Sequence, residues 1–140
     1  MNYLVYLDAK AGELEKILSG VKTMLIKEID PVQSNMATVN PGDHLYFLRD
    51  HEDNVVHVKA TVIRVLLLTN PSEEDLVNTL KEMQPKLRLT EGQYNDWIAK
   101  GKGLFVEIGL ARKIDLFQID SAKIQGRSNW ISFTNLWVER

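Results

Sequence analysis

The chain has 140 residues and a mass of 16.0 kDa; hydrophobic residues make up 44% of it and charged residues 26%. These proportions are those of one ordinary globular domain, and they exclude a disordered tail, a collagen-like chain and a coiled coil. Seventeen basic and nineteen acidic residues give a net charge of −2, and cysteine is absent. The sequence therefore lacks the positive excess of proteins that bind long nucleic acids, and it cannot form a disulfide, a thiolate zinc site or a cysteine nucleophile.

The sequence shows no membrane-spanning or secretory segment. No apolar run approaches the roughly 18 residues that a transmembrane helix needs. Residues 1–8 lack both a basic region and a small-residue cleavage site, so they do not resemble a signal peptide. We expect a single domain over residues 1–140, located in the cytoplasm and without a membrane partner.

The first part of the chain predicts a strand, a short helix and a second strand. Tyr3–Leu7 is a compact apolar run, typical of a strand that is buried on both faces. Apolar residues between positions 14 and 21 follow helical spacing, and Gly20 stands where a helix C-cap is expected. Lys22–Ile29 is then predicted as a strand, followed by a long loop over residues 30–42.

The middle of the chain predicts a hairpin. Asp43–Arg49 and Val55–Leu68 are strand-like and flank the polar segment 50–54. Apolar and polar residues alternate from position 56 to 62, which places one face of the second strand on a core and the other in water.

Two helices are predicted after the hairpin. Ser72 and Thr90 each stand three positions before a polar residue, in the pattern of a capping box. Pro85 is expected to limit the first helix, and Gly101 and Gly103 to end the second.

The last part of the chain predicts long strands. Gly103–Gln118 is strand-like with a bend at Gly109, and Trp130–Val138 forms a last strand after the polar segment 120–129. About six strands and three short helices predict an α+β fold built on a small, mostly antiparallel, curved sheet or barrel.

Motifs of common active sites are absent. The three histidines, at positions 44, 51 and 57, lie in or near the predicted hairpin, and no serine stands in a nucleophile elbow. No metal-ligand spacing occurs, and Gly101-Lys102-Gly103 lacks the rest of a phosphate-binding loop. We expect neither a metal nor a cofactor.

Two aromatic positions differ in their expected roles. Trp97 follows Tyr94 at helical spacing, which is typical of core packing. Trp130 follows the polar residues Arg127 and Asn129, so it is the better candidate for an exposed ring that stacks on a base.

The segment from residue 17 to 27 resembles the signature of the ASCH domain family, Gly-x-Lys-x-x-Glu-x-Arg after a short amphipathic helix. Gly20 and Lys22 match this pattern, whereas Leu25 replaces the family's Glu and Lys27 replaces its Arg. The Pro-Gly-Asp turn at residues 41–43 and the order of the later elements are also similar to that family. The simpler interpretation, which needs no resemblance, is that Gly20 is only a helix cap and that Lys22 and Lys27 are solvated strand residues.

The resemblance implies a PUA-like β-barrel that binds RNA or a single modified nucleoside. A cleft beside the first helix would hold the ligand, with the lysines on phosphate or base and a rim formed by residues 127–130. The residues expected to bind the ligand are Gly20, Lys22, Thr23, Lys27, Arg127, Asn129 and Trp130.

Two alternatives stay open. Some small members of the family are amidohydrolases of N4-acylated cytidine, and they use the motif Lys, a Thr three residues later and a Glu from a later segment. Lys22 matches, Leu25 replaces the Thr, and Glu74 is a candidate for the acid. The other alternative is a protein-interaction or regulatory domain with a vestigial cleft, whose partner the sequence does not identify.

Lys22 carries the sharpest expectation. We expect it at the mouth of the cleft, as a surface residue whose replacement by Ala weakens ligand binding and leaves the stability of the fold nearly unchanged.

Overall fold

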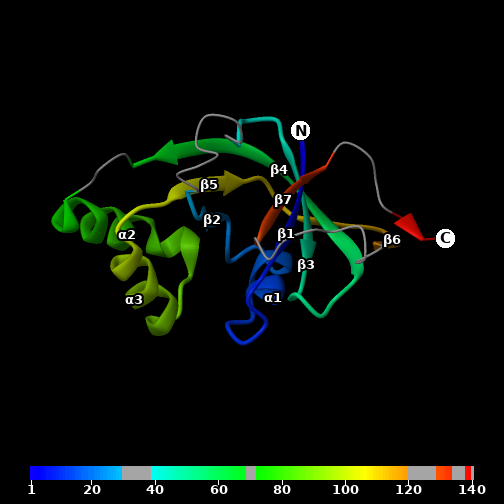
Figure 1. The fold of residues 1–140 in the computed structure, drawn as a ribbon, viewed down its shortest axis with the longest axis horizontal. Coiled ribbons are helices and arrows are strands. Elements are labelled where there is room, and N and C mark those ends of the chain that lie inside the picture. Colours follow the sequence, from blue (N-terminus) through cyan, green and yellow to red (C-terminus); the bar gives the residue numbers. More distant parts are fainter. Residues whose placement is uncertain (30–38, 69–71, 120–128, 134–137, 140) are drawn as a thin grey trace.

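The computed structural model describes residues 1–29, 39–68, 72–119, 129–133 and 138–139 (Figure 1). Eight strands and three helices form within these residues. In chain order the elements are β1 (Asn2–Tyr6), α1 (Glu13–Leu18), β2 (Met24–Lys27), β3 (His44–Leu48), β4 (Val55–Leu67), α2 (Glu73–Leu87), α3 (Glu91–Lys100), β5 (Leu104–Ile108), β6 (Arg112–Ile119), β7 (Trp130–Phe133) and β8 (Val138–Glu139).

The strands form one curled, barrel-like sheet around the long strand β4. The order along its main path is β2-β5-β4-β3-β1-β7, while β6 pairs with β4 and β8. β1 and β3 are parallel and the other pairs are antiparallel. The expected α+β, mostly antiparallel barrel is confirmed, with one parallel pair that the sequence did not predict.

Figure 1 shows α2 and α3 side by side at one end of the sheet, and α1 beside β1. Leu76, Leu80 and Leu87 of α2 are buried against Met24 and Phe105 of the sheet. This packing holds α2 and α3 next to β2. As a result, α3 lies on one side of β2 and the end of β1 lies on the other. No helix in the described ranges is long and apolar enough to cross a membrane.

The predicted end of α2 at Pro85 is wrong, because the helix continues to Leu87. A proline in the last turn removes only one backbone donor, and the side chain of Leu87 is fully buried in the core. The helix ends at Arg88, which adopts a left-handed conformation with φ 52° and donates its backbone N–H to the Gln84 carbonyl.

The predicted strand 103–118 is two strands in the structure. β5 and β6 pair with successive parts of β4, and the bend at Gly109 is confirmed. At this junction, between the end of β5 and the start of β6, Gly109 donates its N–H to the Thr61 carbonyl of β4. β7 ends at Phe133, and residues 134–137 of the predicted last strand lie outside the described residues. Residues 30–38 of the predicted loop over residues 30–42 also lie outside them.

The start of α3 depends on a capping box that the sequence predicted. The Thr90 hydroxyl accepts a hydrogen bond from the Gln93 N–H at 3.2 Å, and the Gln93 side chain accepts one from the Thr90 N–H at 3.1 Å. We expect Thr90→Ala to lower the free energy of unfolding by about 1 kcal/mol, because a backbone donor loses its cap. Urea unfolding measures the change, and Thr90→Ser should retain most of the stability; equal losses for both variants would contradict this role.

Candidate functional site

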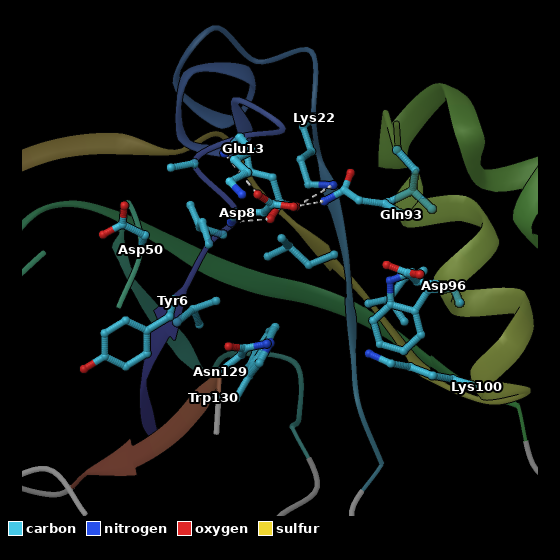
Figure 2. A pocket seen from close by; sticks show the side chains of 18 residues that line it. Tyr6, Asp8, Glu13, Lys22, Asp50, Gln93, Asp96, Lys100, Asn129 and Trp130 are labelled. Carbon is cyan, nitrogen blue, oxygen red and sulfur yellow. Dashed lines mark hydrogen bonds and ion pairs between the residues drawn. The ribbon is translucent and has the colours of Figure 1, made fainter. Parts of the chain in front are cut away.

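A polar cleft lies between the end of β1 and helix α3. Its volume is about 460 Å³, and β2 runs along it between the two walls (Figure 2). Figure 2 shows Tyr6, Asn129 and Trp130 on one side, with Gln93, Asp96 and Lys100 of α3 on the other. The remaining lining residues are Val5, Leu7, Asp8, Ala9, Lys10, Glu13, Lys22, Leu25, Ile26, Asp50, Leu89 and Trp97.

Lys22 lines this cleft, but it is not the surface residue that we expected. Only 2% of its surface is exposed. Its ammonium group lies 3.3 Å from the Glu13 carboxylate and donates a hydrogen bond to the Leu87 carbonyl at the end of α2. The sequence pattern could not show this burial, because both partners come from other elements.

The turn after α1 brings Lys22 back toward Glu13. Gly20 has φ 84°, a left-handed conformation that favours glycine, and the Lys22 backbone N–H donates to the Lys16 carbonyl at 3.0 Å. The chain therefore doubles back on its own helix. This gives the expected glycine of the motif a defined structural role outside the cleft lining.

Glu13 joins Lys22 to the loop after β1. The Glu13 side chain accepts a hydrogen bond from the Asp8 backbone N–H at 2.8 Å, and Asp8 accepts one from the Gln93 side chain at 3.4 Å. The Asp8 carboxylate also accepts the backbone N–H of Lys10 at 3.0 Å. Contacts from α1, the β1 loop, α2 and α3 thus converge on one end of the cleft.

Burial lowers the pKa of the Lys22 ammonium below its usual value, and the charge of Glu13 partly offsets that effect. The lowered pKa makes this ammonium group easier to deprotonate than that of a solvated lysine. A buried lysine that can release its proton beside a carboxylate is the kind of group that functions as a base or a nucleophile.

This lowered pKa predicts a pH dependence of stability. Between the folded-state pKa of Lys22 and the ordinary value of 10.5, the unfolded chain binds a proton that the folded chain does not. The contribution of Lys22 to stability is therefore lowest below its folded pKa and rises with pH toward 10.5. We expect the stability difference between wild type and Lys22→Met to shift in favour of the wild type from pH 7 to pH 10. Urea unfolding across this range measures it, and parallel curves would contradict the shift.

The wall at β7 presents an aromatic ring to the cleft. Trp130 is partly buried and packs edge-on against Tyr3, with ring centroids 6.1 Å apart. Beside it, the Asn129 side chain lies 2.7 Å from the His51 ring nitrogen, and the His51 ring stacks on Tyr6 at 4.2 Å. These contacts hold one wall of the cleft in place.

The opposite wall is one face of α3. Trp97 packs against the core of the helical pair and also lines the cleft, so the predicted core role describes only part of its environment. The Lys100 ammonium lies over the Trp97 ring, 4.5 Å from its centroid. Gln93 belongs to the capping box and also reaches Asp8.

The charges in the cleft are mixed, with acids in excess. Its acidic lining residues are Asp8, Glu13, Asp50 and Asp96, and its basic lining residues are Lys10, Lys22 and Lys100. A surface of this composition does not attract a long polyphosphate. It can offer several hydrogen-bond acceptors to a small polar ligand.

The other predicted residues are distributed unevenly. Asn129 and Trp130 line the cleft, and Lys27 lines a smaller adjoining pocket. Thr23 is absent from both linings. Its backbone N–H donates a hydrogen bond to the Lys86 carbonyl, and its carbonyl accepts one from the Ile108 N–H. Arg127 lies outside the described residues.

Glu74 lies in the first turn of α2, where it is exposed and absent from the lining of both pockets. The carboxylate beside Lys22 is that of Glu13, which sequence reasoning missed together with Asp8, Gln93 and Asp96. The position of Glu13 at the start of the predicted helix gave a weak signal, but its contact with Lys22 depends on the turn at Gly20. Among the described residues, no three potential metal ligands cluster.

The structure resembles solved ASCH structures from Zymomonas mobilis. The ASCH protein itself matches with a TM-score of 0.69 and 15% sequence identity, over 95% of this chain and 87% of that one. A serine-to-alanine variant of it gives a TM-score of 0.69 at 15% identity, with 95% and 88% coverage. A tyrosine-to-phenylalanine variant gives 0.66 at 15% identity, with 95% and 90% coverage.

No family model and no curated protein matches the sequence. At 15% identity the likeness establishes the fold and not the chemistry of the site. The chain therefore has an ASCH-like fold, in agreement with the small α+β barrel that the sequence predicted.

Proposed function

We propose that this protein is a binding module for a single nucleoside unit, free or within RNA, and that the base enters the cleft between β7 and α3. The observation that carries the proposal is the cleft itself: a concave polar site of about 460 Å³ with a tryptophan on each wall and a buried Lys22–Glu13 pair at one end. Sites for small ligands fall in this size range and combine apolar walls with a few convergent polar groups.

The two walls suit a flat ring. Trp130 and Trp97 lie on different elements and both line the cleft, and bases stack on aromatic side chains in proteins that recognise single unpaired nucleotides. The Asp96 carboxylate, exposed on α3, and the Asp8–Gln93 pair provide acceptors and donors for a base edge.

The charge of the cleft agrees with recognition of a base rather than of a phosphate chain. The acidic excess at the lining opposes polyphosphate binding, and the net charge of the whole chain is −2. We therefore expect binding with a shallow salt dependence.

Titration with the four common nucleosides and with N4-acetylcytidine, followed by tryptophan fluorescence and calorimetry, tests the proposal. Trp130→Leu keeps the side chain apolar but removes the flat ring, so it should weaken binding by about tenfold, as expected for the loss of one base–aromatic stack. Leu110→Ala is the matched control, because Leu110 is 83% exposed and lies outside the cleft lining.

The proposal fails if no nucleoside binds to protein that unfolds cooperatively, or if Trp130→Leu binds as tightly as the wild type. Absence of nucleoside and RNA binding would favour the alternative of an interaction domain with a vestigial cleft.

A second candidate is hydrolysis of the acyl group of an N4-acylated cytidine. The observation that favours it is Lys22, whose pKa is lowered by burial and whose amine faces Glu13 inside the cleft. The neutral amine would take a proton from the water that attacks the acyl carbonyl and return it to the departing amino group of cytosine, as the C–N bond breaks.

Release of acetate from N4-acetylcytidine measures this activity. Glu13→Gln keeps the shape of the side chain and should lower the rate by at least about tenfold if Glu13 positions the amine. Cytidine binding without acetate release would leave the binding module as the function.

A further inference from the structure

We infer that Asp96 makes the cleft selective for guanine, because its carboxylate can accept hydrogen bonds from the two neighbouring N–H donors of that base. The inference rests on the proposed nucleoside site and names the base that this site prefers. The shared chemistry is an unpaired guanine, which free guanosine or a single-stranded RNA can supply.

Three of the four carboxylates that line the cleft hold the protein together. Asp8 accepts hydrogen bonds from backbone groups of its own loop and from the Gln93 side chain. Glu13 accepts one from the same loop and faces the Lys22 ammonium. Asp50 accepts two from backbone groups of its own turn. These three side chains therefore stabilise the walls of the cleft.

Asp96 is the fourth carboxylate of the lining. Its side chain has no hydrogen bond or ion pair with any other residue that the structure describes. The residue is exposed, and Figure 2 shows its carboxylate directed from α3 into the space between the two walls. An ionised carboxylate has only acceptor oxygens. A ligand in the cleft must therefore bring hydrogen-bond donors to this wall.

Helix α3 holds Asp96 in a defined position. Gln93, Asp96 and Lys100 all line the cleft, and their spacing places them on one face of the helix. The capping box at Thr90 fixes the start of α3, and Trp97 packs against the core of the helical pair. A carboxylate on a rigid helix, opposite an aromatic wall, is well placed to contact the edge of a stacked base.

Guanine is the common base whose Watson–Crick edge matches a carboxylate. Its N1–H and its N2 amino group are neighbouring donors, so each carboxylate oxygen can accept one hydrogen bond, as in a bidentate pair with Arg. Adenine and cytosine present one amino group next to a ring nitrogen that is an acceptor, and uracil presents one N–H between two carbonyls. Each of these three bases therefore places an acceptor against the carboxylate, which is unfavourable.

Calorimetry with guanosine, inosine, adenosine and cytidine tests the inference. Inosine keeps the N1–H and O6 of guanosine but lacks the N2 amino group. It should bind about tenfold more weakly, as the loss of one charged hydrogen bond predicts. Asp96→Asn replaces one acceptor oxygen by a donor and keeps the shape of the side chain. This variant should bind guanosine about tenfold more weakly and no longer prefer it to inosine, while its affinity for adenosine and cytidine is retained or increased.

Glu91→Gln is the matched control. Glu91 lies in the first turn of the same helix, is exposed and is absent from the linings of both pockets. The control therefore removes the same charge from α3 without a change in the cleft, and it should keep the wild-type order of affinities. Urea unfolding should show equal stability for the two variants, because both positions are on the surface.

Equal affinity for guanosine and inosine in the wild type would overturn the guanine preference and leave the nucleoside site intact. A preference for guanosine that survives in Asp96→Asn would overturn the role of Asp96. Cytidine as the tightest ligand would overturn both and favour the second candidate function. Failure of every nucleoside to bind would overturn the proposed function itself, and the guanine preference with it.

A trinucleotide RNA with a central guanosine distinguishes the two sources of the base. If the guanine belongs to an RNA, this trinucleotide should bind more tightly than guanosine, and exchange of its central base for adenine should remove the gain. Equal affinity of guanosine and the trinucleotide would identify the free nucleoside as the ligand.

Discussion

Replacing Lys22 with Ala is expected to lower the free energy of unfolding by about 3 kcal/mol or more. The substitution removes one member of a buried ion pair, leaving the Glu13 carboxylate in a site where its side chain is only 13% exposed. It also leaves the Leu87 carbonyl without the hydrogen bond that the Lys22 ammonium donates, and it opens a void in the packing. Urea unfolding measures the loss.

Lys81→Ala is the matched control for this experiment. Lys81 is exposed on α2, and its replacement should change stability by no more than about 0.5 kcal/mol. The double variant Lys22→Met and Glu13→Gln should lose less than the sum of the single variants, because it leaves no unpaired charge. Additive losses, or a Lys22→Ala protein as stable as the Lys81→Ala protein, would contradict the buried pair.

Replacing Gly103 with Ala should damage both the fold and the cleft. A Cβ at this buried position would lie 2.6 Å from a methyl group of Ile26 and 3.3 Å from the Trp97 ring, so both must move. Overpacking of this kind costs about 1–3 kcal/mol. Because Ile26 and Trp97 line the cleft, the tryptophan fluorescence of the protein and its ligand affinity should change together with the stability.

Gly92→Ala is the control for that substitution. Gly92 lies in α3, is exposed, and a Cβ there would meet only the Thr90 hydroxyl at 4.0 Å. Alanine favours the helix, so this variant should equal or exceed the wild type in stability. A Gly103→Ala protein with unchanged unfolding and unchanged fluorescence would contradict the packing described between β5, β2 and α3.

The sequence predicted the local elements well because their signals are local. The left-handed turn at Gly20, the capping box at Thr90 and the alternation along β4 depend on residues a few positions apart. The end of α2 was misjudged because the burial of Leu87, a tertiary contact, outweighs the single donor that Pro85 lacks. The parallel pairing of β1 with β3 likewise joins distant segments.

The sequence indicated residues of the cleft lining only where they fall in a motif or a polar segment. Lys22, Asn129 and Trp130 were named in advance and line the cleft. The environment of Lys22 was not predicted. Its burial depends on α2, and its contact with Glu13 depends on the reversal of the chain after α1. A single side chain can be read from a motif, whereas its exposure and its pKa depend on the elements that surround it.

The most direct test of the nucleoside site is a crystal structure of the protein with a bound nucleoside, chosen from the panel as the one with the highest affinity. The account predicts a base between Trp130 and α3, with its polar edge toward the end that holds Asp8, Glu13 and Lys22. A base bound on another surface, with the cleft empty in the same crystal, would contradict it.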